Sequence, residues 1–193
     1  DSTGTPDVQS RGSGLWLVPR FGGPARKISI AGSIVAVSPD GSRLAVSTQA
    51  TSGVQIASVS GELGTLIPVP TIRWVFGLDW STSPGLIVIH GRGLDGQDAI
   101  WTVDPDGKHL RLMYHGGATS GIPHICSTPA AGGIVFTERN AAGASELVRM
   151  TVEGETPVEP EIVLGGLPAS SGCSVSVDGQ RMLYTRITTT SNL

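Results

Sequence analysis

Closely spaced glycine turns, short apolar segments and the lack of a helical pattern predict an all-β fold, a β-propeller built of four-stranded antiparallel blades. One series of turns recurs about every 46 residues and contains Gly41, Gly85, Gly133 and Gly179. A second series of the same period lies between them, at Gly61, Gly107 and Gly154. Two interleaved series with one period indicate one supersecondary unit that is used about four times. A β-sandwich is the alternative, but its turns need not return at a fixed interval.

Each unit is predicted to contain four strands in the same order. First strands, which are short and rich in small residues, are expected at 33–38, 76–81, 124–129 and 172–177. Second strands, which are almost continuously apolar as expected between adjacent blades, follow at 43–48, 86–91, 134–139 and 182–187. Third strands are expected at 54–59, 99–104 and 146–151, and fourth strands at 65–70, 110–115 and 161–166. The glycine turns between first and second strands suit hairpins, because glycine adopts positive φ without strain.

The two ends of the chain carry complementary halves of this unit. Residues 14–29 have the pattern of third and fourth strands, and residues 171–187 that of first and second strands. We therefore expect an N-terminal extension at 1–11 and one propeller domain at 12–193. That domain divides into a half blade at 12–32, blades at 33–71, 72–116 and 117–167, and a half blade at 168–193. The favoured expectation is that the halves join and close a small ring, which removes open sheet edges. The alternatives are a fragment of a larger propeller and an arc that forms a homodimer.

The two cysteines, Cys126 and Cys173, occupy the same position in neighbouring units. Equivalent positions in adjacent repeats are usually too far apart for a disulfide. The sequence therefore predicts two buried free thiols.

Four segments resemble the TolB-type propeller repeat, the Pro-Asp relative of the WD-repeat family. They are SPDGSRLAVS, SVDGQRMLYT, LWLVPRFGGPARKI and IWTVDPDGKHLRLM. The resemblance covers about residues 12–193 and implies a bacterial propeller. Such propellers occur as the periplasmic partner-binding part of TolB, as sensor domains of regulators, and as the gating domain of prolyl-oligopeptidase-type peptidases. The resemblance therefore implies a periplasmic or other extracytoplasmic location rather than a cytoplasmic one.

Charge and spacing exclude several classes of partner. The net charge of −3 provides no basic face, so no nucleic acid is predicted to bind. No apolar run approaches the ~20 residues of a membrane span. No metal or other cofactor is predicted, because no two histidines lie at a metal-binding spacing and the segment 94–98 lacks the final Glu of an EF-hand loop.

The function predicted is that of a non-catalytic module, one part of a larger bacterial protein, that binds a protein, peptide or small ligand at one face of the ring. The sequence lacks the G-x-S-x-G elbow of a hydrolase. Arg73 and Trp74 precede a first strand and have the chemistry of an interface hot spot. Asp79 lies on that strand, and His115 and His124 flank a loop that leads to one mouth of the ring.

Two further functions remain open. One is a channel-sited hydrolase or lyase, built from single residues on first strands such as Asp79, His124 and Cys126, or a peptidase gating domain. The other is a propeller fragment that assembles with itself.

Overall fold

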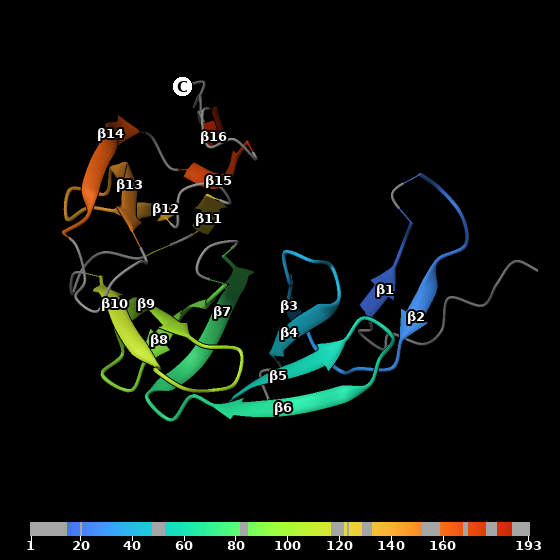
Figure 1. Ribbon diagram of the computed structural model, residues 1–193. Helices are drawn as coiled ribbons and strands as arrows, with labels where there is room; N and C mark the ends of the chain where they lie inside the picture. The colour runs from blue at the N-terminus through green and yellow to red at the C-terminus, as the bar shows by residue number, and fades with distance from the viewer. Residues whose placement is uncertain are drawn as a thin grey trace, which may run out of the picture.

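The chain folds into an open arc of antiparallel sheets (Figure 1). The computed structural model describes residues 15–19, 21–47, 53–81, 85–116, 122, 124–128, 133–151, 159–167, 170–176 and 181–186. All regular elements in this part of the chain are strands, so the predicted all-β propeller fold is confirmed.

Three complete blades follow one another along the arc, each with its strands paired in sequence order. The first blade contains β3 (Ile34–Val37), β4 (Arg43–Ser47), β5 (Gly53–Ser58) and β6 (Leu63–Pro68). The second contains β7 (Ile72–Trp80), β8 (Ile87–Gly93), β9 (Asp98–Val103) and β10 (Arg111–His115). The third contains β11 (His124–Thr128), β12 (Gly133–Arg139), β13 (Ser145–Thr151) and β14 (Glu161–Leu167).

A two-stranded sheet lies at each end of the arc. One pairs β1 (Leu15–Leu17) with β2 (Arg26–Ile28), and the other pairs β15 (Ser170–Val175) with β16 (Met182–Arg186). The two lie far apart in Figure 1, with the complete blades between them. The favoured expectation of a closed ring is therefore wrong for this structure, and the open arc of the alternatives is what the chain forms.

A serine fixes the turn between first and second strands in three of the units. Ser38 Oγ accepts a hydrogen bond from the backbone N–H of Arg43 at 2.8 Å. Ser81 and Ser176 accept the equivalent bonds at 3.0 and 2.9 Å. Gly41 adopts a φ of 72° in the first of these turns, as expected where glycine completes a tight hairpin. The same local chemistry thus builds the same hairpin in these three units.

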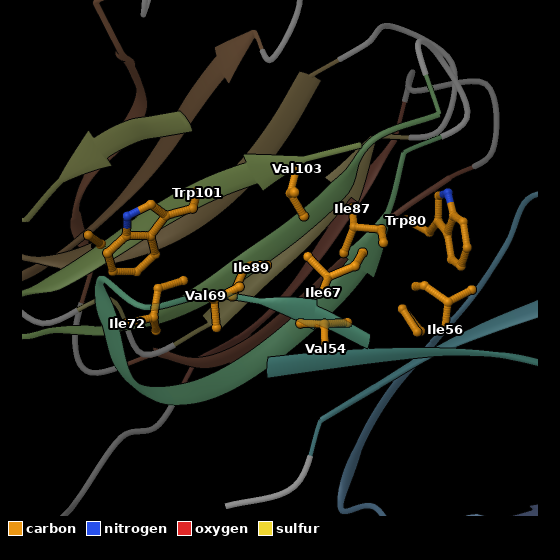
Figure 2. Close-up of a cluster of buried hydrophobic side chains, with 13 residues drawn as sticks. Val54, Ile56, Ile67, Val69, Ile72, Trp80, Ile87, Ile89, Trp101 and Val103 are labelled. Carbon is orange, nitrogen blue, oxygen red and sulfur yellow. The ribbon is translucent and has the colours of Figure 1, made fainter. Parts of the chain in front are cut away.

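Side chains that alternate along the second strands serve two cores at once. Ile87 and Ile89 of β8 point into the core between the first and second blades, which Figure 2 shows with Trp80 and Trp101. Val88, between them, belongs to the core between the second and third blades. The continuous apolar run of this strand is explained because both of its faces are buried.

A disulfide joins Cys126 of β11 to Cys173 of β15, so the prediction of two free thiols is wrong. First strands of adjacent blades lie side by side near the axis, and the Cα atoms of the two residues are 5.8 Å apart. This separation lies within the normal range for a disulfide. Equivalent positions of these two repeats come this close because the blades converge at their first strands.

Candidate binding groove along the first strands

A cavity of about 420 Å³ lies where the first strands meet. Its walls come from three blades and include Val35 of β3, Phe76, Leu78 and Asp79 of β7, His90 of β8 and Ile125 of β11. Most of these side chains are apolar, and Asp79 is the acidic group among those that line it. The cavity therefore offers an apolar wall with one carboxylate.

The orientation of Asp79 is set by its neighbour Trp80. The carboxylate accepts a hydrogen bond from the backbone N–H of Trp80 at 2.7 Å. The indole of Trp80 is buried, and its Nε1–H donates to the carbonyl of Gly85 at 2.9 Å. The turn after β7 thus holds the half-buried carboxylate at the cavity wall.

An aromatic and cationic cluster borders the cavity. The Phe76 ring meets the imidazole of the buried His90 edge-on, with 5.5 Å between the ring centroids. The Arg92 guanidinium lies 5.4 Å from the centroid of the Phe76 ring, a cation–π distance. Arg92 Nε also donates to Asp98 Oδ1 at 2.8 Å, and this hydrogen bond raises the pKa of Arg92.

Two β-bulges in β7 account for the exposure of its aromatic side chains. The pairing of β7 with β8 shifts between Ile72 and Trp74 and again between Val75 and Gly77. Bulges redirect side chains relative to the regular alternation of a strand. As a result, Trp74 and Phe76 are both exposed, by 42% and 46%.

A glycine on β8 allows this close, irregular pairing. A Cβ atom on Gly91 would lie 2.2 Å from the carbonyl oxygen of Trp74. Any side chain at this position would therefore push β7 away from β8, and with it the aromatic residues that border the cavity.

The predicted site residues fall into two groups. Asp79 lines the cavity, and Arg73 and Trp74 lie exposed at the start of the same strand. His115 lies instead at the outer end of the second blade, where its Nε2 is 2.7 Å from Asp95 Oδ2. His124 begins β11 opposite Thr137, and its side chain lies outside the described residues.

Trp74 and His115 nevertheless lie at opposite ends of one row of residues across the second blade. Trp74 pairs with Arg92, and Arg92 pairs with Asp98. The carbonyl of Asp98 accepts the N–H of Gly116, the residue after His115, at 2.8 Å. The backbone N–H of Gln97 and the imidazole of His115 both lower the pKa of Asp95, in that order. The row across this blade therefore contains charged side chains held by hydrogen bonds, and Trp74 lies at its inner end.

Sequence reasoning missed Phe76, His90 and Arg92. His90 lies near the end of the second strand predicted at 86–91, and it forms part of the cavity wall. Phe76 carried a signal that could have been used, because it is a large aromatic residue on a type of strand that is rich in small residues. Arg92 carried none, since its role depends on the bulged pairing of β7.

The disulfide changes what chemistry this region can perform. Cys126, one of three residues considered for a channel-sited enzyme, is buried and bonded to Cys173, so it does not offer a thiolate nucleophile. Among the described residues, no three His, Cys, Asp or Glu side chains gather in a way that could hold a metal ion. Within the same residues, no helix is long and apolar enough to cross a membrane.

The sheets and the cavity between the first strands together define a β-propeller whose first strands face a common axis. Its form is TolB-like: TolB from Acinetobacter baumannii matches 93% of this chain with a TM-score of 0.68 and 15% identity, and 44% of that chain is covered. A nidogen/laminin complex contains a chain with a TM-score of 0.65 at 15% identity, over 84% of this chain and 60% of that one. Streptogramin B lyase has a TM-score of 0.58 at 18% identity, and the match covers 82% of this chain and 50% of that one.

These likenesses establish the fold, because function does not follow from fold at such identities. This chain spans about half the length of the proteins that it resembles. No protein-family model and no curated protein matches the sequence.

Proposed function

We propose that this chain is a non-catalytic propeller module that binds a protein or peptide partner along β7. The observation that carries the proposal is the pair of exposed aromatic side chains, Trp74 and Phe76, on one strand beside a cavity. Aromatic residues and arginine dominate the binding energy of protein interfaces. Arg92, which lies over the Phe76 ring, adds an arginine to this aromatic pair.

The chemistry of the cavity suggests what the partner inserts. A volume of about 420 Å³ is within the range of pockets that hold small ligands, and it is ample for one long side chain. Val35 and Leu78 would contact the apolar part of such a side chain, and Asp79 would accept a hydrogen bond from its tip. We therefore propose a partner segment that presents a lysine or arginine to the cavity.

A hydrolase or lyase sited in the channel is the alternative. The observation that favours it is the presence of Asp79 and His90 in one cavity wall. The likeness to streptogramin B lyase supports only the general possibility, since that protein shows an enzyme on a similar fold. For a peptidase gating domain the support is likewise the fold alone, and function does not follow from fold.

We also propose that residues 12–193 form one domain of a bacterial protein that works outside the cytoplasm. The disulfide between Cys126 and Cys173 supports this location, because such bonds persist mainly in oxidising compartments.

The test is selection of peptides from a random library on the immobilised 193-residue chain. Bound peptides are expected to be enriched in lysine or arginine, and Trp74→Ala and Phe76→Ala are each expected to weaken them by about tenfold or more. Leu66→Ala, which truncates an exposed apolar residue on the outer strand β6, serves as the control and should leave affinity unchanged. Asp79→Asn should remove the preference for basic residues. Peptides that bind both aromatic variants as well as the original chain would show that the interface lies elsewhere.

A further inference from the structure

The guanidinium of Arg92 is held in place by two contacts within the second blade. Its Nε–H donates to Asp98 Oδ1 at 2.8 Å, and its Cζ atom lies 5.4 Å from the centroid of the Phe76 ring. The Asp98 side chain is 11% exposed, whereas that of Arg92 is 45% exposed. The anchoring carboxylate is therefore largely covered, and the cation that it holds remains accessible to a ligand.

The terminal nitrogens of this guanidinium are available for hydrogen bonding. An arginine side chain carries N–H donors on Nε and on both Nη atoms, arranged in a planar fork. Within the described residues, the bond from Nε to Asp98 is the one side-chain hydrogen bond that Arg92 makes. Both Nη atoms can therefore meet a carboxylate, which matches the fork with two parallel hydrogen bonds.

The second blade, which carries Arg92, lies in the interior of the arc. A complete blade flanks it on each side (Figure 1). Within it, β8 is paired on both sides, with β7 and with β9. The bulge between Ile72 and Trp74 places Arg92 opposite Trp74. The accessible cation therefore belongs to a strand with all of its neighbours in place, and it accompanies the exposed aromatic residues of β7.

A negative charge lies further along the same pair of strands. Asp79 lines the cavity and pairs with Val88, whereas Trp74 pairs with Arg92. Arg92 comes four positions after Val88 on β8, and each residue of a strand advances about 3.3 Å, so these two positions are roughly 13 Å apart. The stretch from Arg92 to Asp79, the β7 surface, therefore has a basic end and an acidic end, with Phe76 between them.

We propose that Arg92 binds a carboxylate of the partner segment, which carries an acidic residue about three or four positions from its lysine or arginine. The inference rests on the proposed function, in which that basic residue meets Asp79. An extended segment also advances about 3.3 Å per residue, so three or four residues span the β7 surface. The opposite charges at its two ends set the direction of the segment, because reversal would bring like charges together.

Arg73, the other arginine at this end of β7, is less suited to the role. Its side chain is exposed, and within the described residues it has no hydrogen bond or ion pair that fixes it. A free arginine loses side-chain entropy when it binds. Arg92 has already lost much of that freedom, because Asp98 and the Phe76 ring hold its guanidinium before a partner arrives.

The test uses the peptides selected on the immobilised 193-residue chain. Peptides whose binding depends on Trp74 and Phe76 are expected to carry Asp or Glu about three or four positions from the basic residue. For the most enriched peptide, changing that acid to its amide and Arg92→Gln should each raise the dissociation constant, measured by fluorescence anisotropy, by about tenfold. Both changes together should raise it little further, because they remove the same pair. The amide peptide tests this pair on the unaltered chain, whatever Arg92→Gln does to folding.

Two matched variants separate this role from a structural one. Arg149→Gln also removes an exposed arginine that is paired with a carboxylate, that of Glu161 on the third blade, and should leave affinity unchanged. Arg92→Lys keeps the charge but lacks the planar fork, so it should retain only part of the affinity for the acidic peptide. Fully independent effects of the peptide and protein changes, or selected peptides that need Trp74 and Phe76 but lack the acid, would overturn this inference alone. Peptides that bind without either aromatic residue would overturn the proposed function as well.

Discussion

Removing the disulfide between Cys126 and Cys173 should cost a large part of the stability of the arc. The bond closes a loop with a sequence separation of 47 residues, for which the loop-entropy relation gives about 4 kcal/mol at 25 °C. Reduction leaves both sulfur atoms in place, so reduced protein reports the cross-link alone. A double variant, Cys126→Ala with Cys173→Ala, also loses the packing of the buried Cys126 sulfur and of the half-buried Cys173 sulfur, about 1 kcal/mol more.

Urea unfolding followed by tryptophan fluorescence measures these differences. The oxidised chain should have the highest midpoint, the reduced chain a midpoint lower by the equivalent of about 4 kcal/mol, and the double variant one slightly lower still. The midpoint of the double variant should not respond to reductant, which provides the internal control. Thiol titration in denaturant should find no free thiol in the unreduced chain. Two thiols in that titration, or a midpoint that reduction leaves unchanged, would refute the reasoning.

Two further predictions concern the turns and the bulged strand. Hydrogen bonds from Ser38 and then Ser42 lower the pKa of Asp40 from 3.8 to about 2. Its contribution to stability is therefore complete above pH 3.8 and is lost as the pH falls through about 2; Ser38→Ala should move the pKa upward in a carboxyl NMR titration. Gly91→Ala should destabilise the chain by about 1–3 kcal/mol in urea unfolding. Gly77→Ala, whose Cβ would meet nothing closer than 3.7 Å, should cost less, and equal losses would count against the clash.

The hairpins could be predicted from the sequence because their determinants are local. A glycine turn followed by an almost continuously apolar segment placed the second strand of the third blade at 134–139, and β12 spans Gly133–Arg139. The strand at 76–81 was predicted too short, since β7 begins at Ile72. Its extension depends on bulges and on the close approach that Gly91 allows, and neither is encoded within the strand itself.

The features that escaped sequence reasoning depend on contacts between blades. The disulfide follows from the convergence of β11 and β15, which a repeat length does not reveal. The cavity brings together His90 and Asp79 from neighbouring strands and Ile125 from another blade. In the same way, the pattern of the two half blades indicated that they were complementary, but it did not indicate where the arc would place them.

The double-sided packing of the second strands has a consequence for how such a chain can change in length. Ile87 and Ile89 contact one neighbouring blade while Val88 contacts the other, so each blade presents an acceptor face on one side and a donor face on the other. After duplication or deletion of a unit, every blade would still pack against the same kind of blade face on both sides. Stability in a repeat array is approximately a sum of nearest-neighbour terms, so the change would alter few of these terms. Gain or loss of whole blades would therefore be tolerated in evolution more readily than many single substitutions within β8.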